Sequence, residues 1–412
     1  MKKVFLLLLL TCVTINLFAV KISIAYESIE KQLLMLNAKI VEFEAQNPDI
    51  EVEVFEIPSY PGSTYKFYGT FVVTKANKPT ILSLDFSWVE EFSPFLVDLE
   101  KDSEYFELEK FIPATIEMVK VGENIKAIPY FMDAGVLYYR KDLLEKYNYN
   151  VPKTWEELIK IAKDISQKEN IDGFIWQGAR YEELTNFFFE ILYSYGVDIF
   201  KGNKFVLNEP ENKRKAIEAL TLMKSFIDSG ITRKGVTTYW EEDCRLSFQN
   251  GEALFMRNSL YAWPLLNSDD SPLKGLVGIA PLPISKYIND PFLVLDGKVL
   301  SINPNVTPEE IAAAKKFINF LTSEESQIQV FSDLNFLPVR LYIYENSQIS
   351  GNNIDLKDFK HLTENLKLKP KSAIYSEISF VIQNNVYDCI TGRLTPEKAI
   401  DNIVSEINFL IR

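Results

Sequence analysis

The first part of the chain alternates apolar and polar residues and then changes to a helical period. Residues 20–25 alternate Val, Ile and Ile with Lys and Ser, which predicts a strand. Apolar residues recur every three or four positions over 29–43, which predicts an amphipathic helix that ends at Asn47-Pro48. Residues 50–54 alternate again. A strand-helix-strand unit needs a right-handed crossover and places ligand sites beyond the carboxyl ends of its strands.

The alternation of strand-like and helix-like segments continues to the C-terminus. Strands are predicted at 80–84, 136–140, 172–177 and 299–303. Two capping boxes, Thr154 with Glu157 and Thr307 with Glu310, each mark the start of a helix. Other helices are predicted at 141–147, 181–195, 210–229, 239–250, 324–332, 372–390 and 396–411. This order of elements predicts an α/β protein.

The first 19 residues have the pattern of a secretory signal peptide. Lys2 and Lys3 precede an apolar run over 4–13, and a polar, alternating segment follows Ala19. The apolar run is shorter than the roughly 20 residues that span a bilayer, which favours cleavage over a retained membrane anchor. We therefore expect a protein that is secreted or periplasmic.

Length and composition narrow the class of protein. A chain of 412 residues predicts two domains, and 47% hydrophobic with 25% charged residues is typical of a globular protein. The net charge of -13 argues against binding nucleic acid through a general electrostatic field. One histidine and three cysteines are too few for a usual zinc, haem or iron-sulfur site, so we expect no cofactor. We expect a monomer in which carboxylates and aromatic rings carry the function.

Motifs for catalysis are largely absent from the sequence. The sequence contains no G-x-S-x-G, G-x-G-x-x-G or H-E-x-x-H. His361 lies in a polar stretch typical of a surface histidine. The neighbouring pairs Glu182-Glu183 and Glu241-Glu242 are interpreted as exposed helix charges, because adjacent helical residues point about 100° apart. Whether Cys244 and Cys389 form a disulfide is left open.

Five segments together resemble the extracellular solute-binding proteins of ABC sugar importers. The longest is PYFMDAGVLYYRKDLLEKYNYNVPKTWEELIKIA at 129–162. Others at 174–196, 241–263, 312–327 and 369–407 follow in the order of that family. The resemblance covers nearly the whole chain after the signal and is strongest to the trehalose/maltose-binding branch.

This resemblance implies a two-lobed fold in which each lobe is an α/β sheet flanked by helices. The chain would cross between lobes near 127–135, 292–298 and 338–348. The N-terminal lobe would comprise 20–130 and 295–340, and the C-terminal lobe 131–294 and 341–412. A carbohydrate would bind between the lobes, which would close by a hinge motion and present it to a membrane permease.

The resemblance also implies the ligand-binding residues. Carboxylates and amides bind sugar hydroxyls, and flat rings pack on the apolar C–H faces of a sugar. For Trp88, Tyr261 and Trp263, packing in the core is the alternative role, and for Asp85 it is capping a short helix. Asp133 lies among apolar residues and needs a partner if it is buried. The predicted ligand-binding residues are Asp85, Trp88, Asp133, Gln177, Tyr181, Glu182, Arg257, Tyr261, Trp263, Asp296 and Lys298.

Two positions depart from the family pattern. Ser259 and Lys298 stand where the family commonly has tryptophan, so two stacking surfaces are missing. We therefore expect weak binding of plain maltose or trehalose. Lys298 would pair with Asp296 beside it or, alternatively, reach a negatively charged group on the ligand.

Two other functions stay open at this point. A secreted glycoside-acting enzyme would need two carboxyl groups about 5 to 10 Å apart across one bond. A receptor of the same fold for a non-sugar ligand is the other alternative, because a scaffold does not fix its ligand.

Overall fold

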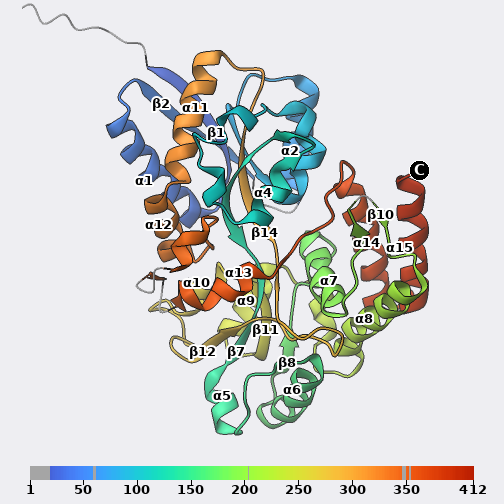
Figure 1. Ribbon diagram of the computed structural model, residues 1–412. Helices are drawn as coiled ribbons and strands as arrows, with labels where there is room; N and C mark the ends of the chain where they lie inside the picture. The colour runs from blue at the N-terminus through green and yellow to red at the C-terminus, as the bar shows by residue number, and fades with distance from the viewer. Residues whose placement is uncertain (1–18, 59–61, 203, 346–348, 352–353) are drawn as a thin grey trace, which may run out of the picture.

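The protein folds into two α/β lobes that lie one above the other in Figure 1. The structure is a computed structural model, and it describes residues 19–58, 62–202, 204–345, 349–351 and 354–412. The predicted signal peptide therefore lies almost wholly outside the described residues. Two sheets of five and four strands form the centres of the lobes. This confirms the predicted α/β class.

The sheet of the first lobe is mixed. Its strand order is β2-β1-β3-β14-β6, in which β1 pairs in parallel with β2 and β3, and β14 runs antiparallel to β3 and β6. The carboxyl ends of β1, β3 and β6 therefore lie at the same edge as the amino end of β14. The strands are β1 (Val20–Glu27), β2 (Ile50–Ile57), β3 (Ile81–Asp85), β6 (Ile128–Asp133) and β14 (Asp296–Ile302).

Helices cover this sheet on both sides (Figure 1), with α1, α11 and α12 on one side and α2 and α4 on the other. The predicted box of Thr307 and Glu310 begins α11, where the Thr307 side chain accepts a hydrogen bond from the Glu310 N–H. Phe43 of α1 packs against Phe317 of α11 with ring centres 4.9 Å apart. The helices are α1 (Glu30–Gln46), α2 (Ser63–Thr74), α4 (Pro113–Val119), α11 (Pro308–Leu321) and α12 (Glu324–Leu334).

The sheet of the second lobe has the order β12-β7-β11-β8. Strand β7 is antiparallel to β11 and β12, whereas β8 is parallel to β11. The amino end of β7 thus lies beside the carboxyl ends of β8 and β11. The strands are β7 (Gly135–Arg140), β8 (Asp172–Ile175), β11 (Ala253–Ser259) and β12 (Val277–Ala280).

The second lobe is enclosed by helices from the middle and from the end of the chain. The predicted capping box of Thr154 and Glu157 begins α6, and Trp155 directly after it is buried against Phe174 and Phe226. The C-terminal helices α14 and α15 pack on each other and on α7 and α8. The helices are α5 (Lys141–Lys146), α6 (Trp155–Glu169), α7 (Glu182–Ser194), α8 (Pro210–Asp228), α9 (Glu241–Gln249), α10 (Ala262–Leu266), α14 (Tyr375–Ile390) and α15 (Pro396–Leu410).

The chain passes between the two sheets through short segments. Strand β6 ends at Asp133 in the first sheet, and β7 begins at Gly135 in the second. The short strand β13 (Leu293–Val294) pairs with β17 (Leu366–Lys367) just before β14 begins in the first sheet. The third predicted crossing, 338–348, includes residues 346–348, which lie outside the described residues.

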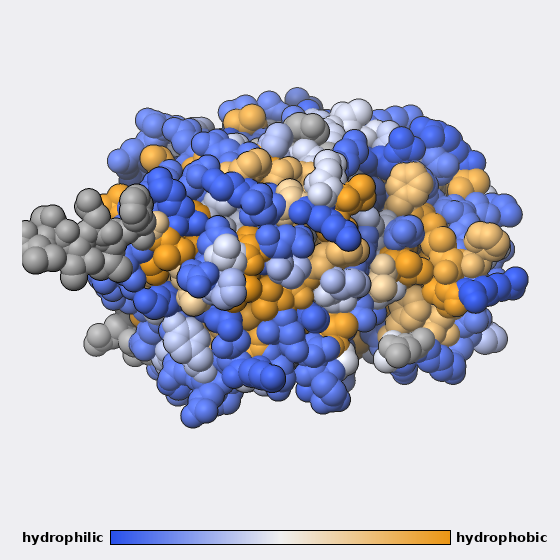
Figure 2. Space-filling view, turned by 90° about the horizontal axis from the view of Figure 1, so that it is seen from above, coloured by the Kyte–Doolittle hydropathy of each residue, from blue (hydrophilic) through white to orange (hydrophobic). Residues whose placement is uncertain are grey.

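Most predicted elements are confirmed to within a few residues, with one instructive difference. Strand β8 ends at Ile175 instead of Gln177, and the Gln177 side chain, through its Nε2, donates to the backbone oxygen of Arg257. Cys244 and Cys389 are free and buried, and His361 is exposed as predicted. Among the described helices, we found none with the length and apolar character that crossing a membrane requires. The face seen from above in Figure 2 is mostly hydrophilic, with apolar patches between the charged side chains.

Candidate ligand site between the lobes

The two sheet edges bring polar side chains together from distant parts of the sequence. Glu27, Asp85 and Asp133 are the last residues of β1, β3 and β6. In the sheet register, Lys298 of β14 lies opposite Asp85, and Asp296 lies opposite Asp133. Carboxyl ends of parallel strands are where α/β folds place their ligands.

Lys298 binds two carboxylates of its own lobe. Its Nζ lies 2.7 Å from Asp85 Oδ1 and 3.0 Å from Glu27 Oε1. Burial opposes the ammonium charge, but the two carboxylates outweigh burial and raise the pKa of Lys298. The predicted pair of Lys298 with Asp296 is therefore wrong, because the strand register places Asp85 opposite the lysine. Asp85 also makes no capping hydrogen bond to the turn that follows it.

Asp296 instead binds Lys369, a residue that the sequence did not single out. Lys369 Nζ lies 3.0 Å from Asp296 Oδ2 and 3.7 Å from Glu182 Oε1. Asn186 of α7 joins them, since its Nδ2 donates to Asp296 Oδ2 at 2.8 Å and its Oδ1 accepts from Lys369 at 3.0 Å. Lys369 thus connects Asp296 of β14 in the first lobe with Glu182 and Asn186 of α7 in the second lobe.

Arg257 is the third cation and lies at the carboxyl end of β11. Its Nε and Nη2 donate to the two oxygens of Glu190 at 2.9 and 2.6 Å, a bidentate geometry that holds the guanidinium in one plane. Its Nη1 donates to Gln177 Oε1 at 3.0 Å and to Glu183. We call the following side chains the charged network: Glu27, Asp85, Lys298, Glu182, Asp296, Lys369, Glu183, Glu190 and Arg257.

Two further carboxyl groups lie beside the charged network and form no ion pair with any residue in the described part of the chain. Asp133 Oδ1 accepts from the backbone N–H of Ala134 at 2.8 Å and of Leu260 at 3.1 Å. Burial raises the pKa of Asp133 to about 7. Glu241 accepts a hydrogen bond from the Tyr181 hydroxyl at 2.9 Å. Burial is the larger cause and repulsion from Glu183 the smaller one that raise the pKa of Glu241 to about 7.

The predicted aromatic residues lie in different environments. Trp88 is half-buried, packs edge-on against Tyr65 at 5.7 Å and contacts the cores of both lobes. The Tyr181 ring packs in a tilted arrangement against Trp240 with ring centres 4.4 Å apart, and the Tyr261 hydroxyl donates to Glu242 at 2.9 Å. Trp263 is 6% exposed and packs in the core.

The prediction of exposed helix charges is wrong for Glu182, Glu183 and Glu241, which are partly buried, and is confirmed for Glu242, which is exposed. Helix α7 is packed against β7, α8 and α14, which partly buries the acids of its first turn. A signal for this was present, because Glu183, Asn186 and Glu190 are spaced along one face of an otherwise apolar helix. Glu27 is the last residue of its strand, as Asp85 is, whereas nothing in the local sequence marks Lys369.

A small pocket lies within the charged network, with room for about one water molecule. It is lined by Ala134, Gly135, Glu183, Asn186, Glu190, Arg257, Ser259, Val294 and Asp296. Among the described residues, no three acids, histidines or cysteines are arranged to hold a metal ion. The side chains that line the pocket offer hydrogen-bond acceptors and donors.

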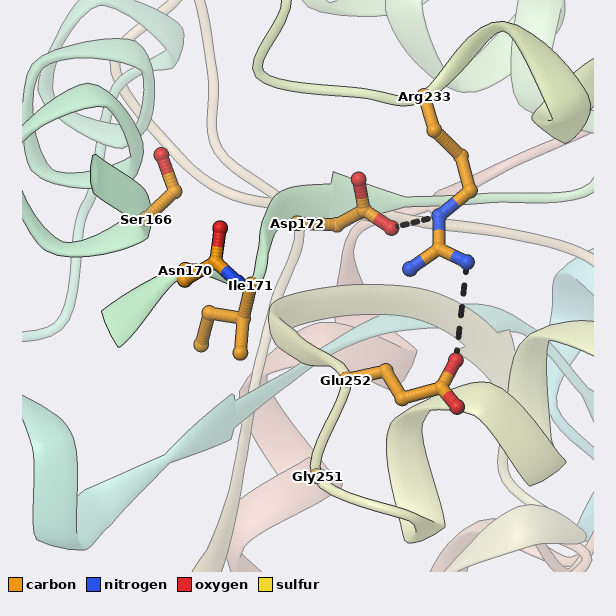
Figure 3. A pocket seen from close by; sticks show the side chains of 7 residues that line it. All are labelled: Ser166, Asn170, Ile171, Asp172, Arg233, Gly251 and Glu252. Carbon is orange, nitrogen blue, oxygen red and sulfur yellow. Dashed lines mark hydrogen bonds and ion pairs between the residues drawn. The ribbon is translucent and has the colours of Figure 1, made fainter. Parts of the chain in front are cut away.

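A second, more open pocket lies where α6 ends and β8 begins (Figure 3). Arg233 reaches across it to Asp172 and to Glu252, the latter at 3.7 Å. The other residues that line it are Ser166, Asn170, Ile171 and Gly251. It contains none of the predicted ligand-binding residues.

Comparisons with known proteins agree with this architecture. The model of a family described as bacterial extracellular solute-binding protein matches residues 38–355. A solved structure of T. maritima MalE3 with maltose bound is 44% identical, covers 95% of this chain and 100% of its own, and has a TM-score of 0.89. A probable ABC transporter-binding protein of Deinococcus radiodurans is 28% identical over 86% of both chains. A multiple sugar-binding protein of Streptococcus mutans is 22% identical over 77% of this chain and 75% of its own. This chain belongs to the family of bacterial extracellular solute-binding proteins.

Proposed function

We propose that this protein is the extracytoplasmic substrate-binding subunit of an ABC transporter and that it captures a carbohydrate, an oligosaccharide, between its lobes. The observation that carries the proposal is the meeting of two sheet edges that brings carboxylates and amides together, with Trp88 packed against the cores of both lobes. Many oxygen acceptors near a flat ring suit a ligand with many hydroxyls and apolar C–H faces. The 44% identity to a protein solved with maltose supports a sugar as the ligand.

The predicted ligand-binding residues form part of this proposal. The five charged or amide residues Asp85, Asp133, Gln177, Glu182 and Asp296 would bind hydroxyls directly or position the side chains that do. Lys298 and Arg257 would fix the directions of these carboxylates. Closure of the lobes would bring both sets onto one sugar and present the closed form to a membrane permease.

The test is to purify the secreted protein and identify any small molecule that it carries by native mass spectrometry. Titration calorimetry with maltose, trehalose and longer α-linked glucosides then gives the affinity. We expect a carried or titrated saccharide with a stoichiometry of about one per chain. A carried peptide or amino acid, with no saccharide bound, would contradict the proposal.

We propose further that the protein binds without turnover. Incubation with labelled oligosaccharides, followed by chromatography, checks this point. We expect the label to be recovered unchanged, and a shortened product would favour a glycoside-acting enzyme instead.

A further inference from the structure

Each cation of the charged network is held between two carboxylates. Lys298 binds Asp85 and Glu27, and Lys369 binds Asp296 and Glu182. Arg257 binds Glu183 and Glu190. The network therefore contains six carboxylates around three cations, and the positive charges are already neutralised by the protein itself.

The cations also lie beneath their partners. The side chains of Arg257 and Lys369 are each 1% exposed, whereas Glu183 is 14%, Asp296 26% and Glu182 33% exposed. Lys298 is 16% exposed, which is less than the 20% of Glu27 and the 22% of Asp85. A ligand that enters between the lobes consequently meets carboxylate oxygens before it meets any nitrogen of these cations.

Asp133 and Glu241 add to this excess of carboxyl groups over cations. Neither forms an ion pair with the residues that the structure describes, and both already face repulsion from neighbouring acids, Asp296 and Glu183 in the case of Asp133. An anion placed here would need to be taken out of water without a free cation to compensate its charge. A hydroxyl group has no such difficulty, because it donates to a carboxylate.

We infer that this site accepts uncharged saccharides or those with a cationic amine, and that it excludes acidic ones such as phosphorylated, sulfated or uronic-acid sugars. The inference rests on the proposed function and adds the charge class of the ligand to it. It replaces the alternative in which Lys298 reaches an anionic group of the ligand, because Asp85 and Glu27 already compensate the charge of that ammonium group.

The test is a thermal-shift screen of the full chain against free mono- to tetrasaccharides arranged as matched pairs, each neutral sugar with its phosphorylated or uronic-acid counterpart. Maltose with maltose 1-phosphate and trehalose with trehalose 6-phosphate are two such pairs. We expect every sugar that raises the melting temperature to be neutral or aminated, with affinity at least tenfold above that of its acidic counterpart. An acidic sugar that binds as well as its neutral partner would overturn the inference and leave sugar binding standing. A screen without any binding sugar would overturn the proposed function and this inference with it.

A variant tests the cause of the exclusion. Replacing both partners of Lys298, Glu27→Gln with Asp85→Asn, leaves that lysine without a countercharge. We expect the affinity for a neutral sugar divided by that for its acidic counterpart to fall at least fivefold in this variant. Added salt should reduce this change. The control is Glu51→Gln with Glu53→Gln, which removes two exposed acids that pair with Lys21 and Lys78 on the surface. An unchanged ratio in a folded variant would contradict the role given to the carboxylates. If the double variant does not fold, Glu183→Gln removes one of the two carboxylates of Arg257, and we expect a smaller fall in the same ratio, because Glu190 remains.

Discussion

Asp133 joins the two lobes without an ion pair to any residue that the structure describes. It ends β6, and its Oδ1 accepts two backbone N–H groups, one from Ala134 beside it and one from Leu260 of the second lobe. These hydrogen bonds favour the ionised form, but burial is the larger effect and raises the pKa to about 7. The residue therefore joins the lobes at a point where its charge changes near neutral pH.

This raised pKa predicts a pH dependence of stability. A carboxyl group with a higher pKa in the folded state binds more protons there, so its contribution to stability is lost as the pH rises from about 4 toward 7. Asp133→Asn cannot ionise, and its amide oxygen can still accept both N–H groups. Between pH 5 and pH 8, we expect the free energy of unfolding of the wild type to fall by about 1–2 kcal/mol relative to that of the variant. Urea denaturation at each pH measures this difference.

The control for this experiment is Glu51→Gln, which removes an exposed acid from the same sheet. The two variants separate a local effect of Asp133 from a general effect of net charge. Equal changes in both variants with pH would show that the environment of Asp133 is not the cause.

Helix α7 determines how the second lobe contributes to the site. Its apolar residues Phe187, Phe188 and Ile191 are buried in the core, while Glu183 and Glu190 bind Arg257. The helix itself was predicted at 181–195 and is found at Glu182–Ser194. The inward direction of its acids was not predicted, since this depends on β11 supplying Arg257 from 67 residues further along the chain.

Gly135, the first residue of β7, leaves room for Glu190 of α7 to bind Arg257 of β11. A Cβ atom at this position would overlap the Glu190 carboxylate and lie 2.6 Å from the Arg257 guanidinium. Gly135→Ala must therefore displace the ion pair, and we expect a loss of about 1–3 kcal/mol in the free energy of unfolding. Thermal and urea unfolding check this value.

The matched control is Gly69→Ala in α2. A Cβ atom there meets nothing within 4 Å, and alanine is the better helix former, so we expect a gain of about 0.5–1 kcal/mol. Similar losses in both variants would show that glycine is needed at Gly135 for a reason other than its contact with Glu190.

At the scale of the whole molecule, the fold was more predictable than the site. Periodicity, capping boxes and the family resemblance all depend on local residues, and the elements at 155–169 and 308–321 formed where they were predicted. The partners of Lys298, Asp296 and Arg257 instead depend on strand register and on the approach of two lobes. Asp85 and Lys298 are 213 positions apart, and no local pattern connects them.

The lobes also contact each other away from the charged network. The hydroxyl group of Ser376, near the start of α14, donates to Glu91 Oε2 at 2.7 Å, and Lys371 lies 3.9 Å from Glu90. Glu90 and Glu91 belong to α3 (Val89–Phe92), which follows β3 of the first lobe. These contacts can exist only while the lobes are close together, so they should bias the proposed hinge toward the closed form.

We therefore expect Ser376→Ala to favour the open form without changing a residue of the charged network. One hydrogen bond to a partly exposed carboxylate is worth about 1 kcal/mol, which corresponds to a roughly fivefold weaker affinity for a saccharide that binds the closed form. Small-angle scattering should give a larger radius of gyration for the unliganded variant than for the unliganded wild type, and saturating saccharide should bring the two profiles together. Ser225→Ala is the control, because the Ser225 hydroxyl donates only within α8, to the Leu222 backbone oxygen. If Ser376→Ala and Ser225→Ala give the same scattering profile and the same affinity, the contact between α3 and α14 does not govern closure, and the position of the lobes must be set at the strand ends themselves.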